Sequence, residues 1–192
     1  MAYYPIFLEL RNRPCLVVGG GEVAYRKAQV LIRCAAAVTL ASPKLHGGLK
    51  RLVKQGKARW LKHPFRPGDL KAMELVVAAT NDQPVNERVS RLCQRKGIWV
   101  NVVDQPRLCS FIVPSVVRRR MLTVAISTGG ASPALSKWIR KDMEQRYGPE
   151  FGRLVKGMHK IRPRVLARVR GVAARKALFE KALKAYFRVL RS

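Results

Sequence analysis

The sequence predicts an α/β protein built on a doubly wound parallel sheet, and two observations support this prediction. Short apolar runs that suit buried strands alternate with helical patterns over residues 15–102, and this alternation is typical of parallel sheets. The first apolar run also leads straight into three glycines, Gly19–Gly21, which are followed by apolar residues at helical spacing. The chain has 192 residues, 48% of them hydrophobic, which is enough for a sizeable core and an additional region.

The elements of this sheet follow one another at short intervals. After a lead-in over residues 3–10, we expect strands at 15–18, 37–41, 58–61, 75–79 and 98–102, with helices at 22–33, 45–55 and 84–96. Ser42-Pro43 ends the second strand, because proline cannot donate to a strand ladder. The third helix carries Val85, Val89 and Leu92 on one face, as an amphipathic helix requires.

The alternation ends near residue 112. Residues 111–117 and 121–126 predict two strands joined by a basic turn, and Ser132-Pro133 suits the start of a helix that runs to about Tyr147. Helices are then expected at 150–160 and 173–190, with a short piece at 164–169 between them. The chain therefore divides into residues 1–112, a small α+β region over 113–147 and a basic helical domain over 148–192.

The glycine turn has the form of a phosphate-binding loop. Gly19, Gly21 and Ala24 occupy the places of the pattern G-x-G-x-x-G/A, in which the glycines allow a tight turn and close approach to a pyrophosphate. Free N–H groups at the start of the following helix would point at the anion. The pattern predicts a Rossmann-type domain whose cofactor contacts include Gly19, Gly20, Gly21, Glu22 and Val23. A purely structural glycine turn is the alternative.

Polar residues follow two further strands of the predicted sheet. Ligands of open α/β sheets bind at the carboxyl ends of the strands, where Thr80-Asn81 and Asn101…Asp104 are expected. Thr80 and Asn81 would lie near a ribose or the nicotinamide. Asp104 could take the proton that leaves when a hydride leaves, or it could simply occupy a turn before Gln105-Pro106.

The acid that usually follows the second strand and binds the ribose hydroxyls is absent. That place reads Ala41-Ser42-Pro43-Lys44. Ser42 could donate to a ribose oxygen, and Lys44 could favour a 2′-phosphate or be an ordinary surface lysine. On physical grounds the choice between NAD and NADP therefore stays open.

The charge of the chain is strongly positive, with 39 basic and 11 acidic residues and a net charge of +28. Residues 151–192 hold 13 basic residues and one acid, Glu180. Such a balance attracts polyanions, either nucleic acid or a small molecule with many carboxylates. A nucleic-acid-binding protein on a Rossmann scaffold is therefore an alternative, although it leaves the glycine turn unexplained, and a non-catalytic dinucleotide sensor is another.

Neither a metal site nor a membrane segment is expected. The four cysteines are scattered without a C-x-x-C motif, and the three histidines stand alone, so zinc and redox motifs have no support. No apolar run approaches the length of a membrane span, and the N-terminus has no signal-peptide pattern. We expect a cytoplasmic protein with reduced cysteines.

Five motifs occur in a fixed order, and together they resemble a known family. They are Val17-Val-Gly-Gly-Gly-Glu-Val-Ala24 with Arg26-Lys27, Ala79-Thr-Asn-Asp82, Asn101-Val-Val-Asp104, Phe111-Ile-Val-Pro-Ser115 and Ile126-Ser-Thr-Gly-Gly-Ala-Ser-Pro133. Over residues 1–147 the chain resembles precorrin-2 dehydrogenase, the sirohydrochlorin-forming component of sirohaem synthases. The helical tail agrees in type but has no specific motif.

This resemblance implies an activity, an assembly and a set of site residues. It implies NAD-dependent oxidation of precorrin-2 to sirohydrochlorin by a homodimer, with residues 113–147 as the dimerisation region. The essential aspartate of the family falls on Asp104 and the asparagine before it on Asn101, and the substrate loop carries Ser127, Thr128, Gly129 and Ser132. That loop could bind a substrate carboxylate through backbone N–H groups or only cap a helix.

Three further expectations concern chemistry outside the dehydrogenase reaction. Some members of the family also insert iron or cobalt with the same aspartate, and in one branch the serine that falls on Ser127 can be phosphorylated. The methyltransferase domain of fused sirohaem synthases has no counterpart in these 192 residues, so we expect a separate methyltransferase to supply precorrin-2.

Overall fold

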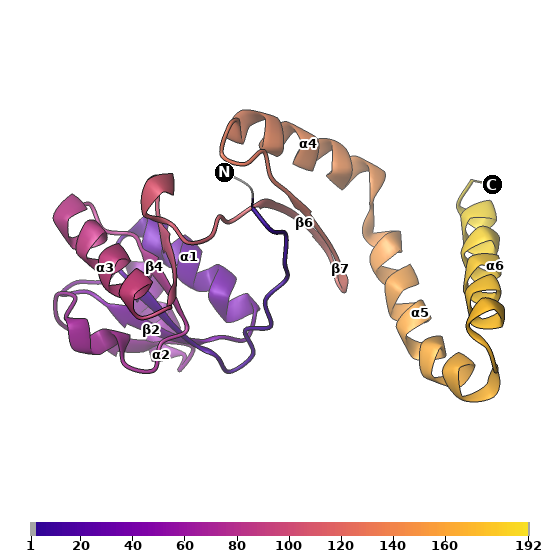
Figure 1. Ribbon diagram of the computed structural model, residues 1–192, viewed down its shortest axis with the longest axis horizontal. Coiled ribbons are helices and arrows are strands. Elements are labelled where there is room, and N and C mark those ends of the chain that lie inside the picture. The colour runs from indigo at the N-terminus through magenta and orange to yellow at the C-terminus, as the bar shows by residue number, and fades with distance from the viewer. Residues whose placement is uncertain (1–2, 192) are drawn as a thin grey trace. The chain divides into compact units, whose positions relative to one another are not determined.

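A computed structural model describes residues 3–191, with side chains described as far as Phe187. The chain divides into two compact units, with the boundary in the sequence between Val113 and Pro114 (Figure 1). The first unit is a five-stranded parallel sheet with helices on both faces, and the second contains two antiparallel strands and three helices. The predicted fold class is therefore confirmed, whereas the further division near residue 147 stays a prediction.

The parallel sheet has the strand order β3-β2-β1-β4-β5. Its strands are β1 (Pro14–Val18), β2 (Ala37–Ala41), β3 (Arg59–Leu61), β4 (Leu75–Ala78) and β5 (Trp99–Val102). Val18 is in register with Ala41 on one side and Ala78 on the other, so the carboxyl ends of these three strands lie at one edge. The strand order reverses between β1 and β4, which is the position where open α/β sheets bind their ligands.

Helices cover both faces because successive strand residues point to opposite sides of a sheet. On one face Val17 and Leu40 pack in a cluster with Ala28 and Leu49 from α1 (Glu22–Arg33) and α2 (Gly47–Lys54). On the other face the cluster contains apolar residues of β1, β4 and β5 together with Val89 from α3 (Gln83–Arg95). These two cores fix the strand ends from which the site is built.

The boundaries of most elements agree with the sequence predictions. The helix at 22–33 and the strand at 37–41 coincide residue for residue with α1 and β2. α2 begins two residues later than expected, because His46 is its N-cap and accepts a hydrogen bond from the Gly48 N–H at 3.1 Å. Two short 3₁₀ helices, η1 (Pro67–Leu70) and η2 (Pro106–Leu108), were not expected.

The second unit opens with a hairpin of β6 (Ser115–Arg119) and β7 (Leu122–Ile126). The turn between them is basic, as expected, and Arg120 adopts a left-handed backbone with φ +58°. β6 starts four residues later than predicted, directly after Pro114, because a proline has no N–H to donate to the ladder.

Three helices complete this unit: α4 (Pro133–Arg146), α5 (Pro149–Arg168) and α6 (Val172–Arg191). The expected break between residues 160 and 164 is wrong, since α5 continues through Pro163. Proline removes one hydrogen bond and crowds the carbonyl four residues before it, but the residues on both sides of Pro163 stay helical. The Arg119 guanidinium donates to the carbonyls of Glu144 and Tyr147 at 2.9 and 2.8 Å. These bonds provide donors for two backbone carbonyls at the C-terminal end of α4.

Within residues 3–191 no helix is long and apolar enough to cross a membrane.

Candidate functional site

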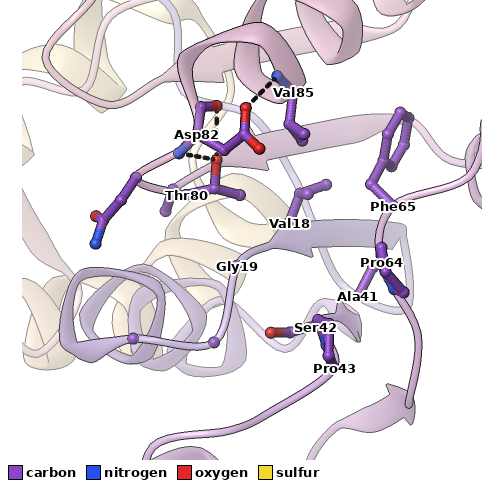
Figure 2. Close-up of a pocket in the computed structure, with 14 residues that line it drawn as sticks. Val18, Gly19, Ala41, Ser42, Pro43, Pro64, Phe65, Thr80, Asp82 and Val85 are labelled. Atoms are coloured by element: carbon purple, nitrogen blue, oxygen red, sulfur yellow. Dashed lines mark hydrogen bonds between the residues drawn. The ribbon is translucent and has the colours of Figure 1, made fainter.

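A pocket of about 340 Å³ lies at the carboxyl edge of the parallel sheet, at the switch point between β1 and β4. Its floor is formed by the ends of β1, β2 and β4, and its side walls come from the loops that follow them (Figure 2). Pro64 and Phe65, which follow β3, close one side of the pocket. Sequence reasoning missed this apolar wall, because nothing in a Pro-Phe pair after an edge strand indicates a ligand.

The three glycines have three different surroundings. Gly19 adopts φ +125°, and a Cβ there would lie 2.3 Å from the Ala79 carbonyl oxygen. A Cβ on Gly20 would lie 1.9 Å from the Lys44 carbonyl oxygen, whereas a Cβ on Gly21 would meet no atom within 4 Å. The first two glycines are thus required by the protein itself. The third borders open space, as a site for a close-approaching pyrophosphate should.

The N-terminus of α1 faces this open space without a capping side chain. Gly21 is the N-cap residue and, within the described residues, no side chain accepts from the first turn of the helix. The side chain of Glu22 instead points to His46, with 3.2 Å between its Oε2 and the imidazole Nε2. Uncapped N–H groups and the helix dipole favour an anion at this position, so the predicted role of Glu22 and Val23 would depend on their backbone.

The glycine turn is held against the loop after β2. The His46 N–H donates to the Gly20 carbonyl at 2.7 Å, and the Trp60 indole N–H donates to the Ser42 carbonyl at 2.8 Å. Ser42 is buried and its hydroxyl donates to the Lys44 carbonyl at 2.7 Å. Since this uses the only hydroxyl proton, Ser42 offers a ribose an acceptor instead of the donor that the sequence suggested.

On the β4 side of the pocket, Thr80 is hydrogen-bonded to another protein side chain, whereas Asn81 is exposed. The Thr80 hydroxyl is 2.8 Å from Oδ1 of the buried Asn86, whose amide nitrogen donates to the Thr80 carbonyl at 3.0 Å. Asp82 caps α3 by accepting from the Val85 N–H at 3.0 Å (Figure 2). Asn81 lines the pocket and is exposed. Thr80 therefore shapes the loop, and Asn81 is the residue of the predicted pair that is open to a ligand.

Asp104 lies in the turn that follows β5, exposed and with a left-handed backbone at φ +58°. In the described part of the chain no hydrogen bond or ion pair holds its carboxylate. Asn101, by contrast, is buried, and its amide donates to the Phe111 carbonyl at 3.1 Å. Asn101 thus fastens the returning chain to β5, and its predicted contact with substrate stays a prediction.

Lys27 is a site residue whose place the sequence did not indicate. It is half-buried on α1, and burial lowers the pKa of its ammonium while the negative charge of Asp104 acts in the opposite direction. The two opposite charges therefore interact beside the end of β5. The sequence showed Lys27 only as a basic residue of the first motif, because its position relative to Asp104 depends on how α1 packs against the sheet.

The loop over residues 127–132 belongs to the second unit. Ser132 is the N-cap of α4 and accepts from the Leu135 N–H at 3.2 Å, as predicted. The Thr128 hydroxyl donates to the Ser132 carbonyl at 3.0 Å, and the Ser127 hydroxyl accepts from the Gly129 N–H at 3.0 Å. These bonds give the loop a fixed shape. Substrate binding by Ser127, Thr128, Gly129 and Ser132 stays a prediction.

The described residues contain no group of three or more His, Cys, Asp or Glu side chains placed to hold a metal ion. None of the four cysteines forms a disulfide bond. Burial raises the pKa of the Cys15 and Cys93 thiols to about 11, so both remain protonated and unreactive near neutral pH.

Two family models match the chain in sequence order. The model described as putative NAD(P)-binding matches residues 6–115, and the model described as the central part of a sirohaem biosynthesis protein matches residues 119–146. The first covers more than half of the chain and includes the entire parallel sheet.

Similar proteins are found among both curated sequences and solved structures. The chain is 49% identical over 154 residues to a siroheme synthase of Methylobacillus flagellatus, covering 80% of this chain and 33% of that protein. It is 42% identical over 184 residues to a siroheme synthase of Nitrosococcus oceani, covering 96% and 39%. The chain therefore spans about two-fifths or less of the length of these relatives.

A solved structure described as "SirC, precorrin-2 dehydrogenase" matches nearly the whole chain. The TM-score is 0.78 at 27% sequence identity, covering 93% of this chain and 88% of that one. The resemblance expected from the five ordered motifs is confirmed. The chain therefore belongs to the family of putative NAD(P)-binding proteins, in the form in which that domain is followed by the central region of sirohaem biosynthesis proteins.

Proposed function

We propose that this chain catalyses the oxidation of precorrin-2 to sirohydrochlorin with NAD as the hydride acceptor. The observation that carries the proposal is the open space beside Gly21. There the N-terminus of α1, which has no capping side chain, borders a pocket at the switch point of the sheet. The similarity to the protein described as a precorrin-2 dehydrogenase over 93% of this chain supports the substrate.

The cofactor would be held at three places. Its pyrophosphate would lie at Gly19–Gly21 and the N–H groups of Glu22 and Val23. Its adenosine ribose would lie beside Ser42, and Asn81 would face the ribose or nicotinamide from the β4 side. Bound NAD supplies the two-electron acceptor of the reaction.

The reaction removes one hydride and one proton from the tetrapyrrole. Since the hydride leaves with the cofactor, the protein must provide an acceptor for the proton. We assign this role to the carboxylate of Asp104, directly or through a water molecule that it orients. Its exposed position and its lack of a hydrogen-bonding partner among the described residues suit that task.

The substrate carries many carboxylates, and two features suit it. The Ser127–Ser132 loop would bind a carboxylate through its N–H groups and hydroxyls. The net charge of +28 would raise the rate of substrate capture at low salt. We further propose that the enzyme acts as a homodimer in the cytoplasm, where the four cysteines, none of them in a disulfide bond, stay reduced.

The test is anaerobic turnover of precorrin-2 by the purified chain with NAD. NADH should form in step with the sirohydrochlorin spectrum, and Asp104→Ala should suppress both while NAD affinity stays within about threefold. Tight NAD binding without NADH formation would refute the enzyme assignment in favour of a dinucleotide sensor. Full turnover by Asp104→Ala would refute the role of that residue. Adding ferrous iron or cobalt to the product tests for metal insertion.

A further inference from the structure

We infer that the adenosine end of the pocket does not select against a 2′-phosphate, so that the chain binds NADP about as tightly as NAD. The inference rests on the proposed function, because it assumes that the pocket holds a nicotinamide dinucleotide. It concerns the loop after β2, where dinucleotide-binding domains distinguish the two cofactors.

Selective NAD sites carry a carboxylate at the end of the second strand. That carboxylate accepts hydrogen bonds from the ribose hydroxyls and repels a 2′-phosphate. Here β2 ends at Ala41, whose side chain is buried in the sheet core. The buried Ser42 and the exposed Pro43 follow it and line the pocket. Neither carries a negative charge, so the repulsive element is absent from this wall.

Asp82, which lines the pocket, and Glu22, which follows the lining residue Gly21, both have other interaction partners. Asp82 is the one acidic residue that lines the pocket, and its carboxylate accepts from the Val85 N–H at the start of α3. Figure 2 shows Asp82 across the pocket from Ser42 and Pro43. Glu22 turns to His46, 3.2 Å away. His46 Nδ1 accepts from the Gly48 N–H, so its proton lies on Nε2 and points at Glu22.

Positive charge, in contrast, flanks the end of β2. Lys44 follows Pro43 directly and is exposed. The Lys62 ammonium lies 5.8 Å from the centre of the Trp60 ring, and the indole of Trp60 is bonded to the Ser42 carbonyl. Lys44 therefore lies in the loop after β2 and Lys62 is linked to that loop through Trp60, although neither lysine lines the pocket itself. A dianionic phosphate on the ribose would be attracted here, where most NAD sites would repel it.

The experiment is calorimetric titration of the full-length chain with NAD and with NADP at physiological ionic strength. The expected dissociation constants differ by less than tenfold. A dissociation constant for NADP more than tenfold above that for NAD overturns the inference and would point to Glu22 as a substitute for the missing acid. Failure of both cofactors to bind would refute the proposed function itself.

Two variants locate the effect. Pro43→Asp places a carboxylate on the exposed wall of the pocket and should weaken NADP binding at least tenfold while NAD stays within threefold. Lys44→Ser should weaken NADP alone by a few-fold. Lys50→Ser, which removes another exposed charge, on α2, is the matched control and should leave the ratio of the two constants unchanged. Equal losses for both cofactors in Pro43→Asp would overturn the assignment to this loop.

Discussion

Replacing each of two adjacent glycines by alanine should separate the structural from the ligand-binding role of the turn. Gly20→Ala places a Cβ 1.9 Å from the Lys44 carbonyl oxygen and 2.5 Å from the Ser42 hydroxyl oxygen. Gly21→Ala places a Cβ in open space. The first change should therefore destabilise the fold without any ligand, and the second should weaken the binding of NAD in a protein that is still folded.

The magnitudes follow from these distances. Side-chain Cβ atoms essentially never lie closer than 3.0 Å to another heavy atom, so in Gly20→Ala the glycine turn and the loop after β2 must separate by about 1 Å. Overpacking of this kind costs about 1–3 kcal/mol, and loss of the hydrogen bond from His46 to Gly20 adds about 1 kcal/mol. Gly21→Ala costs up to about 1 kcal/mol as a poorer N-cap.

Urea unfolding of the apo protein and calorimetric titration with NAD measure the two effects independently. We expect Gly20→Ala to lose about 2–4 kcal/mol of unfolding free energy, and Gly21→Ala to bind NAD at least about tenfold more weakly. Unchanged stability of Gly20→Ala would contradict the close packing of the two loops. NAD affinity within threefold of wild type in Gly21→Ala would show that the pyrophosphate does not lie at this turn.

Three further predictions concern stability. Burial raises the pKa of the Cys15 and Cys93 thiols from about 9 to about 11, so these thiols ionise first in the unfolded chain. Their contribution to the unfolding free energy should therefore be constant below about pH 9 and fall between pH 9 and 11; an equal fall in wild type and in Cys15→Ala/Cys93→Ala, measured by urea titrations, would refute this. Asp82→Ala should cost about 1 kcal/mol by uncapping α3, whereas Glu87→Ala on the same helix should cost under about 0.5 kcal/mol in the same assay. Arg119→Ala should cost about 1–3 kcal/mol, since two carbonyls at the end of α4 lose their donor, and a thermal midpoint equal to that of wild type would exclude such a role.

Periodicity and glycine chemistry were sufficient to predict the sheet and its order of elements. The start of α1 and the end of β2 followed from local signals alone. The glycine turn directly precedes α1, and the Ser42-Pro43 pair directly follows β2. The continuity of α5 through Pro163 did not follow, since a proline in a helical pattern marks either a break or a continued helix. The hydrogen-bonding state of Ser42 was also beyond sequence reasoning, because it depends on where the Lys44 carbonyl lies.

The contrast between Asp82 and Asp104 shows what the structure adds at the site. Both follow a strand of the parallel sheet, and from the sequence alone a turn or cap role suits either. The carboxylate of Asp82 is used to cap α3. Asp104 begins no helix, and its left-handed backbone is uncommon for a residue other than glycine.

The turn that carries Asp104 is held by other residues. The Cys109 thiol lies 3.1 Å from the Val102 nitrogen and 3.2 Å from the Val102 carbonyl oxygen, and Asn101 anchors the chain at Phe111. Because these contacts maintain the turn, the carboxylate of Asp104 is free of hydrogen bonds within the described residues, although its charge interacts with that of Lys27. That freedom distinguishes a proton acceptor from a helix cap, and it is the physical reason for assigning the chemistry to Asp104 and not to Asp82.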